Sequence, residues 1–427
     1  MSHILSSLEA TAKSVTALFS SRSSQYISSS LLHHSRQCAM KHQQLRVTTQ
    51  FFHQGRRYST TPRKISDPLH ILFCGSDEFS CASLKVLHGE HVQNPDLIRS
   101  IDVVVRPGKR TGRGYKVVRD PPIRSLAESL GLQIHERDTF TGWDMPSKTN
   151  LIIAVSFGLF VPPRLLRGAK YGGLNLHPSL LPDLRGPAPL QHTLLTGRKK
   201  TGVSLQTLDH KTFDHGLVLS QTSSLRVPMT VPDLQALVTP IAANMLIDGL
   251  RAGLHVPPLE DKGWKPNEKE AAALVHAPKI TKMDRRLTSS LLETCETETS
   301  ALSRRQNAIG PLWFESRDRQ GRKKRVIIEG LEDLPALRDS RPSMLTETLP
   351  SSTSPHKQYL IPFEEEEEET QDSDTSTQYL VFWDDHVRGK EHDDSLCLGD
   401  YRVLSLKVEG DRAKPARLAL QSFIVNR

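Results

Sequence analysis

The stretch LHILFCGSDEFSCASLKVL, residues 69 to 87, decides the fold of the larger part of this chain. It begins with a short apolar run of the length that a buried strand needs, and Gly75-Ser76-Asp77 then marks a tight turn. From Phe79 to Leu87, apolar residues recur at helical spacing. A strand, a turn and a helix in this order predict an α/β domain.

The same alternation continues downstream and predicts a sheet covered by helices. The run at 150–155 is continuously apolar, as in the central strands of parallel sheets. Further strands are expected at 101–105 and 173–177, helices at 121–131, 189–196 and 231–253, and a hairpin from 202–208 and 216–221. We expect this domain to span residues 67–256 and a linker to occupy 257–274.

A second, smaller unit is expected from residue 275 to residue 427. It contains a helix and several short strands, including 379–383 and 401–406. The tract at about 335–377 is rich in Ser, Thr, Pro and Glu and includes a run of acids from Glu364. Such a composition buries too little apolar surface to fold, so we expect a disordered acidic insertion in a small β domain.

The first 66 residues differ from the rest of the chain. They hold nine Lys or Arg, one acid and many serines, and this segment alone accounts for the formal net charge of +8. This composition predicts a disordered mitochondrial transit peptide and location in the mitochondrial matrix, with an ordinary disordered tail as the alternative. The run Arg56-Arg57-Tyr58-Ser59 is typical of a matrix-protease cleavage site.

Several classes of protein and of site are excluded. No run approaches the roughly 18 apolar residues of a membrane span. The five cysteines are odd in number and form no CxxC pair, which argues against a disulfide framework and a zinc site. Cys74 and Cys81 are expected to be small buried hydrophobic residues, and we expect no metal.

The segment GGLNLHPSLLPDLRG, residues 172 to 186, carries the clearest chemical signal. Asn175 and His177 are two apart on an expected strand, so their side chains point to the same side. An amide donor beside an imidazole suits acyl transfer, in which an oxyanion needs donors and an attacking amine must lose a proton. Taken singly, Asn175 could cap a turn and His177 could be a core histidine.

This segment resembles the hallmark of the folate-dependent formyltransferases, Asn-x-His-x-Ser-Leu-Leu-Pro followed by Arg-Gly or Lys-Gly. A second hallmark, Asp-x-Gly before a short apolar strand, is matched from Asp214 to Leu219, and Thr201-Gly202-Val203 matches between them. The resemblance implies a Rossmann-like N-terminal formyltransferase domain, a smaller C-terminal OB-like β-barrel domain, and 10-formyltetrahydrofolate as the formyl donor.

The resemblance also implies roles for three residues. Asn175 and protonated His177 would stabilise the oxyanion, while Asp214 would hold the histidine and relay protons. A loop Asx-turn is the structural alternative for Asp214. His215 stands where the family usually has a small residue, and we expect it to crowd the site or to add a titrating group.

Folate-binding residues are likewise implied by the resemblance. The segment from Val155 to Pro162 is similar to the one whose backbone lines the family's pterin pocket, because exposed backbone at a strand end supplies donors and acceptors in a fixed array. The expected folate-binding residues are Phe157, Gly158, Leu159, Ser179, Leu180, Leu181 and Pro182.

Three features resemble the branch of the family that formylates initiator methionyl-tRNA for mitochondrial translation. They are the segment from Ile71 to Phe79, a basic loop that we expect to be mobile from Arg106 to Lys116, and the basic second unit, in which Trp313 is expected to be core. The expected tRNA-binding residues are Arg106, Lys109, Arg110, Arg113, Lys116, Arg304 and Arg305. We expect a monomer.

Two alternatives concern the acceptor. A formyltransferase acting on a small amine would share the same catalytic core, but it would not need the second, basic unit. A catalytically dead RNA-binding relative would keep the second unit but would have lost Asn175, His177 or Asp214, and all three are present.

Overall fold

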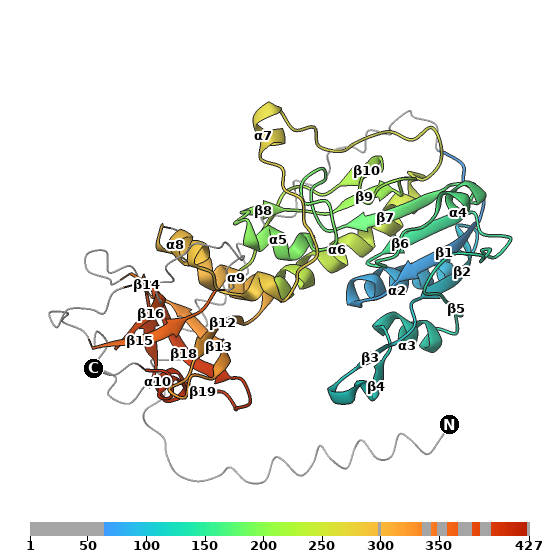
Figure 1. The fold of residues 1–427 in the computed structure, drawn as a ribbon. Helices are drawn as coiled ribbons and strands as arrows, with labels where there is room; N and C mark the ends of the chain where they lie inside the picture. The colour runs from blue at the N-terminus through green and yellow to red at the C-terminus, as the bar shows by residue number, and fades with distance from the viewer. Residues whose placement is uncertain are drawn as a thin grey trace, which may run out of the picture. The chain divides into compact units, whose positions relative to one another are not determined.

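A computed structural model describes residues 64–297, 300–334, 343–347, 357–365, 378–384 and 394–424 (Figure 1). Most of the expected transit peptide, all of its cleavage-site motif and most of the acidic run lie outside these residues. Within them, no helix is both long enough and apolar enough to cross a membrane.

The larger domain is built on a seven-stranded sheet with the order β10-β9-β7-β6-β1-β2-β5. Five strands run parallel, β9 pairs antiparallel with β7, and β10 pairs antiparallel with β9 at the edge. The strands are β1 (Leu69–Gly75), β2 (Ile98–Val105), β5 (Gln133–Glu136), β6 (Leu151–Val155), β7 (Gly173–His177), β9 (Ser204–Thr207) and β10 (Val218–Gln221). The predicted Rossmann-like sheet is confirmed.

Alternate residues of β1 serve two apolar cores, one on each face of the sheet. Ile71 and Phe73 pack with the helices of one face, whereas Leu72 and Cys74 pack with α4 on the other. The first face is covered by α2 (Glu78–Gln93), α3 (Pro122–Ser129), α5 (Pro189–Leu195) and α6 (Val231–Arg251), and the second by α4 (Pro163–Gly168). Burial on both faces explains the continuous apolar runs in the sequence.

The basic segment after β2 is ordered more regularly than the expected mobile loop. Strands β3 (Lys109–Thr111) and β4 (Val117–Arg119) form an antiparallel hairpin around the 3₁₀ turn η1 (Arg113–Tyr115). The hairpin stands away from the sheet in Figure 1. A second small ribbon joins β8 (Lys200–Thr201) to β11 (Leu225–Arg226).

The expected linker contains one short helix, α7 (Glu268–Ala272), and it leads to η2 (Met283–Arg285), α8 (Ser289–Thr297) and α9 (Ala301–Ile309). An eight-stranded antiparallel sheet follows, with the path β12-β13-β18-β17-β16-β14. Its strands are β12 (Leu312–Arg317), β13 (Lys323–Asp333), β14 (Leu345–Thr346), β15 (Gln358–Phe363), β16 (Gln378–Trp383), β17 (Leu396–Leu398), β18 (Tyr401–Val408) and β19 (Lys414–Pro415), with α10 (Ala416–Leu420) after them.

This second sheet curls on itself, because Glu315 on β12 pairs with Glu364 just beyond β15. The curl encloses a separate core of buried apolar residues that includes Phe314, Phe382 and Tyr401. The arrangement is a half-barrel consistent with the expected OB-like domain.

The range expected to be a disordered insertion, 335–377, contains two strands. β14 and β15 both pair with β16, and Tyr359, Leu360 and Ile361 of β15 are buried. The prediction of disorder was wrong for these strands because the polar composition of the surrounding tract hides a five-residue apolar segment, Tyr359 to Phe363. The cross-strand contacts with β16 supply the missing stabilisation.

The folded domain also begins earlier than residue 67. The Lys64 ammonium donates hydrogen bonds to the carbonyl oxygens of Val256 and Pro258, and the Ser66 hydroxyl lies 2.9 Å from His255 Nε2. The expected boundary of the N-terminal segment at residue 66 is therefore too late by at least three residues.

Candidate active site

Strand β7 delivers two polar side chains to the carboxyl end of the parallel sheet. Asn175 and His177 lie two residues apart and face the same side, as the alternation of a strand requires. The neighbouring strand β9 runs antiparallel to β7 and places Gln206 directly opposite Asn175. Three polar side chains thus meet at this edge of the sheet.

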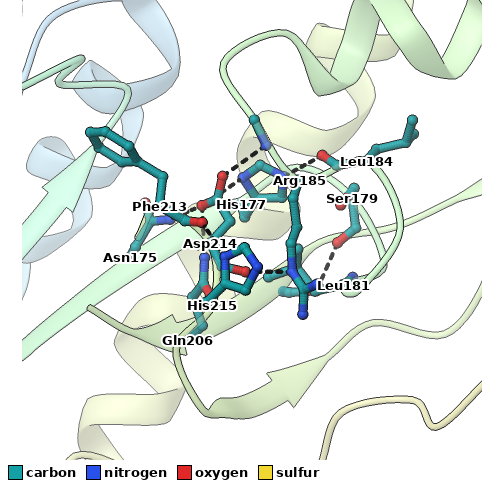
Figure 2. A network of polar contacts seen from close by, with 12 residues as sticks. Asn175, His177, Ser179, Leu181, Leu184, Arg185, Gln206, Phe213, Asp214 and His215 are labelled. Carbon is teal, nitrogen blue, oxygen red and sulfur yellow. Dashed lines mark hydrogen bonds and ion pairs between the residues drawn. The ribbon is translucent and has the colours of Figure 1, made fainter. Parts of the chain in front are cut away.

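Asp214 completes this group from the loop between β9 and β10. Its backbone lies in the left-handed region with φ 59°, a conformation that Asp tolerates better than most residues. One carboxylate oxygen accepts hydrogen bonds from Asn175 Nδ2 at 3.1 Å and Gln206 Nε2 at 2.9 Å. The other accepts from the Gly186 N–H at 3.0 Å, so three donors hold a largely buried negative charge (Figure 2).

The Asp-x-Gly pattern of this loop has a steric cause. Gly216 lies against β9 so closely that a Cβ would stand 1.7 Å from the carbonyl oxygen of Thr207. Only glycine fits this approach, and the approach carries Asp214 toward β7.

His177 is almost completely buried, with both ring nitrogens facing acceptors. Nε2 lies 2.8 Å from the Leu184 carbonyl oxygen, and Nδ1 lies 3.3 Å from Asp214 Oδ1. A carbonyl oxygen only accepts, so Nε2 carries a proton. The imidazolium form offers a donor to both neighbours, whereas the Nε2–H neutral form would turn the Nδ1 lone pair toward a carboxylate.

A cavity of about 560 Å³ opens beside these residues. Asn175, His177 and Asp214 line its polar side, and Phe157, Leu159 and Phe213 contribute to its apolar wall. Its size is that of a pocket for a small organic ligand, and its few convergent polar groups are typical of a site that orients a reacting group.

Comparison with known proteins places this site in a family. A family model described as formyl transferase matches residues 69–236. A putative methionyl-tRNA formyltransferase of Schizosaccharomyces pombe is 37% identical over 192 residues, which are 44% of this chain and 54% of the relative. The mitochondrial methionyl-tRNA formyltransferase of Saccharomyces cerevisiae is 32% identical over 282 residues, 57% of this chain and 69% of the relative.

The chain belongs to the formyltransferase family. The mitochondrial methionyl-tRNA formyltransferase of Bos taurus is 29% identical over 62% of this chain and 63% of its own length. The chain therefore spans between about half and two thirds of the length of the three relatives named here.

The expected folate-binding residues divide into two groups. Phe157, Gly158 and Leu159 line the cavity. Ser179, Leu180, Leu181 and Pro182 are not among its lining residues. Ser179 Oγ donates to the Asp183 carbonyl oxygen and the Leu181 N–H donates to Ser204 Oγ, so this segment braces the loop that follows His177.

Sequence reasoning gave no individual role to three residues that hold this site together, although two of them form the Arg-Gly of the first hallmark. They are Gln206, Arg185, whose Nε donates to the Asp214 carbonyl oxygen at 2.8 Å, and Gly186. A weak signal for Gln206 was available, because Ser204 and Gln206 alternate with apolar residues on an expected strand. The pairing of β7 with β9, which brings Gln206 to Asn175, leaves no local trace in the sequence.

His215 does not crowd the candidate site. Its side chain is exposed, and its Nδ1 lies 2.7 Å from the Phe213 carbonyl oxygen (Figure 2). His215 is also absent from the residues that line the cavity, although Asp214 is among them.

The basic residues expected to bind tRNA lie in two places. Lys109, Arg110 and Lys116 are exposed on the β3–β4 hairpin, whereas Arg106 at its base pairs with Asp138 at 2.6 Å. The side chain of Arg113 lies outside the described set.

Arg304 and Arg305 are half-buried on α9, and Arg305 Nε donates to the Asp284 carbonyl oxygen. Trp313 is 8% exposed and packs against the Arg325 guanidinium, as expected for a core residue.

Cys74 is buried, as its place in an apolar strand predicted. Burial raises the pKa of the Cys74 thiol well above its usual range, so this thiol stays protonated. No group of three or more His, Cys, Asp or Glu residues within the described ranges is placed to hold a metal ion.

Proposed function

We propose that this chain transfers the formyl group of 10-formyltetrahydrofolate to the amino group of methionyl-tRNA in mitochondria. The single observation that carries the reaction is the convergence of Asn175, His177 and Asp214 on one cavity. In the transfer, the acceptor nitrogen bonds to the formyl carbon, the bond from that carbon to folate N10 breaks, and a proton passes from the amine to N10.

Asn175 is positioned to stabilise the oxyanion that develops on the formyl oxygen when the amine adds to the formyl carbon. Its amide nitrogen has two hydrogens, and the bond to Asp214 accounts for one. The second is free to donate to an oxygen in the cavity. Because Asp214 fixes the amide beforehand, little reorganisation is needed when charge develops.

His177 contributes a positive charge and a second donor. Its 3.3 Å contact from Nδ1 to Asp214 is longer than an ordinary N–H···O hydrogen bond, while Nε2 is bonded at 2.8 Å. Nδ1 is therefore the nitrogen that a substrate oxygen can approach. Asp214 accepts from the ring at Nδ1 and supplies the base through which the amine proton is relayed.

The donor is proposed to enter the cavity with its pterin against the backbone of Phe157, Gly158 and Leu159. Gly158 has φ 70°, so the chain bends at this strand end and exposes its peptide groups. A pterin requires such a fixed set of donors and acceptors. The apolar wall supplied by Phe160 and Phe213, whose rings stack edge to face at 5.3 Å, suits the remaining aromatic part.

Methionyl-tRNA is the proposed acceptor because the chain has more than the catalytic domain. The exposed cations of the β3–β4 hairpin suit phosphate contact, and a half-barrel domain follows the linker. The fungal and bovine relatives are named for this acceptor. The names of two of them, together with the Arg- and Ser-rich N-terminal composition, support import into the mitochondrial matrix.

The test is an acceptor competition with the purified chain and formyl-labelled 10-formyltetrahydrofolate. Methionyl-tRNA, a purine-pathway aminoribonucleotide and an amino-sugar nucleotide are offered separately and then together. We expect label on methionyl-tRNA in both formats. Label confined to a small amine would overturn the proposed acceptor, and release of free formate alone would overturn the proposed transfer.

A further inference from the structure

The connection to the C-terminal domain continues past the expected boundary at residue 274, and its residues 273–277, here called the linker, pair with the loop that holds the catalytic residues. The Leu184 N–H donates to the Val275 carbonyl oxygen at 2.8 Å, and the Ala277 N–H donates to the Arg185 carbonyl oxygen at 2.7 Å. A third bond runs from the Ala188 N–H to the Ala277 carbonyl oxygen at 3.2 Å. Residues 275–277 thus extend along the loop 184–188 like an added strand.

The same loop residues bond directly to the catalytic side chains. The Leu184 carbonyl oxygen accepts from His177 Nε2, and the Gly186 N–H donates to the Asp214 carboxylate. The peptide group between Arg185 and Gly186 thus accepts from the linker through its carbonyl oxygen and donates to Asp214 through its N–H, and Leu184 bonds to the linker through its N–H and to His177 through its carbonyl oxygen. A shift of the linker would move both the acceptor of His177 and a donor to Asp214.

The loop needs this support because its backbone conformation is unfavourable on its own. Leu184 has φ 58°, a left-handed conformation that is costly for a residue with a large side chain. Gly186 has φ 123°, and a Cβ there would lie 2.4 Å from the Ala277 carbonyl oxygen. The strained part of the loop backbone is therefore the part that contacts the linker.

One ion pair fixes the linker at this place. Asp183 Oδ1 accepts from the Val275 N–H at 3.0 Å and from Arg198 Nη2 at 3.1 Å. Arg198 Nη2 also donates to the Ala273 carbonyl oxygen at 2.6 Å. Asp183 and Arg198 are half-buried, and neither lines the cavity beside His177. They hold the linker without contacting that cavity.

We propose that Asp183, together with Arg198, is a positioning residue that orients His177 and Asp214 through the linker segment 275–277. The catalytic site is therefore complete only when the linker to the C-terminal domain is in place. This inference rests on the proposed function, because it assigns Asp183 a part in formyl transfer by the same site.

The test compares Asp183→Ala with Asp183→Asn in the full chain. Alanine removes the acceptor of the Val275 N–H, whereas the asparagine carbonyl oxygen retains it. We expect Asp183→Ala to lower kcat at least tenfold, with KM for folate and for methionyl-tRNA within twofold. Asp183→Asn should recover most of that loss, and Arg198→Met should lower kcat in the same direction.

Glu90→Ala is the matched control, because Glu90 is a buried carboxylate paired with Arg251 and lies between α2 and α6, away from the loop. It should lower Tm by as much as Asp183→Ala does while kcat stays within twofold. The inference fails if kcat of Asp183→Ala falls no further than that of Glu90→Ala, or if asparagine restores nothing.

If Asp183→Ala does not fold, Arg198→Met is compared with Glu90→Ala in its place. A kcat of Arg198→Met equal to that of Glu90→Ala would count against the positioning role.

The assay follows tetrahydrofolate release with methionyl-tRNA and with a small amine as acceptor. A wild-type chain that formylates only the small amine contradicts the proposed acceptor, while the variants still test the positioning role on that amine.

Discussion

Asp214 is held by donors from three different segments of the chain, and Gln206 supplies one of them. The Gln206 amide is 1% exposed and donates to the same carboxylate oxygen that faces His177. A carboxylate fixed by charge-assisted hydrogen bonds keeps its geometry and its charge, and both are needed to hold a cationic imidazole. Gln206 therefore supports the catalytic carboxylate, and it also lines the cavity.

Replacing Gln206 with Leu should lower kcat about tenfold to a hundredfold, since a hydrogen bond to a charged group contributes about 1.5–3 kcal/mol. Gln206→Glu should be worse, because it would turn a second carboxylate toward Asp214. Steady-state kinetics with both substrates checks this, alongside circular dichroism to verify folding. Full activity in a folded Gln206→Glu variant would rule out the supporting role.

His215 should be dispensable for the chemistry in spite of its position next to Asp214. Its ring is exposed and bonded to the Phe213 carbonyl oxygen, away from the residues that line the cavity. His215→Ala should keep kcat within about threefold of the wild type and leave the pH profile of kcat unchanged. A displaced pH profile would mean that the imidazole titrates within reach of the reacting groups.

Catalytic residues that lie on one strand or in a recognised motif could be predicted, whereas the partners that hold them across strands and loops could not. Asn175 and His177 lie on one short segment, so their alternation was readable from the sequence. Gln206 reaches Asp214 only because β9 pairs with β7, and Gly186 does so only because a loop folds back. Such contacts depend on tertiary geometry that local periodicity does not encode.

At the scale of elements, the segment before β1 is fastened to the chain that follows α6 through His255. Its Nε2 lies 2.9 Å from Ser66 Oγ, and its ring packs edge to face on Tyr171. The Ser66 hydroxyl already donates to the Asp67 carbonyl oxygen, so it accepts from the neutral imidazole. His255 Nδ1 has no hydrogen-bond partner within the described residues.

Burial, with a smaller contribution from the Lys64 charge, lowers the pKa of His255 to about 4 in the folded protein. Protonation therefore favours the unfolded chain, in which the pKa is near 6.5. The contribution of the neutral His255 to the free energy of unfolding is fully present above pH 6.5. It is lost as the pH falls toward 4, and the loss is roughly 3 kcal/mol at most. Denaturant unfolding from pH 4 to 7 measures it.

His255→Phe serves as the comparison for this pH dependence, because it keeps a ring against Tyr171 without a titrating group. We expect the difference in unfolding free energy between the wild type and His255→Phe to change across this pH range and to be constant above pH 7. A pH-independent difference would show that His255 does not titrate on unfolding.

Strand prediction depended on the composition around each strand. The apolar runs of β1 and β6 stand between turn signals and were readable, whereas β15 lies in a tract of Ser, Pro and Glu that masked it. The edge strand β5 is also half exposed and only four residues long, so its alternation is too short to detect.

At the scale of the whole molecule, the β3–β4 hairpin concentrates exposed cations close to exposed apolar side chains. Lys109, Arg110 and Lys116 are exposed, and Tyr115 is 69% exposed at the turn between the strands. When such cations contact phosphates, they release counterions from the nucleic acid. The affinity for tRNA should therefore fall as the salt concentration rises.

The triple variant Lys109→Ala, Arg110→Ala, Lys116→Ala should raise KM for methionyl-tRNA and flatten its dependence on salt, while KM for folate stays constant. The matched control removes Lys85, Lys148 and Arg167, three exposed cations outside the hairpin, and should leave the salt dependence as in the wild type. Equal effects of the two triple variants would point to net charge rather than to the hairpin.

Single-turnover formyl transfer to methionyl-tRNA, with both substrates saturating, tests most directly whether Asn175 and His177 carry the reaction. The loss of one preorganised oxyanion donor costs about 10²–10³ in rate, so Asn175→Ala and His177→Ala should each slow transfer by that order while folate affinity, measured by equilibrium binding, changes little. Transfer at a near-wild-type rate by either folded variant would contradict this assignment.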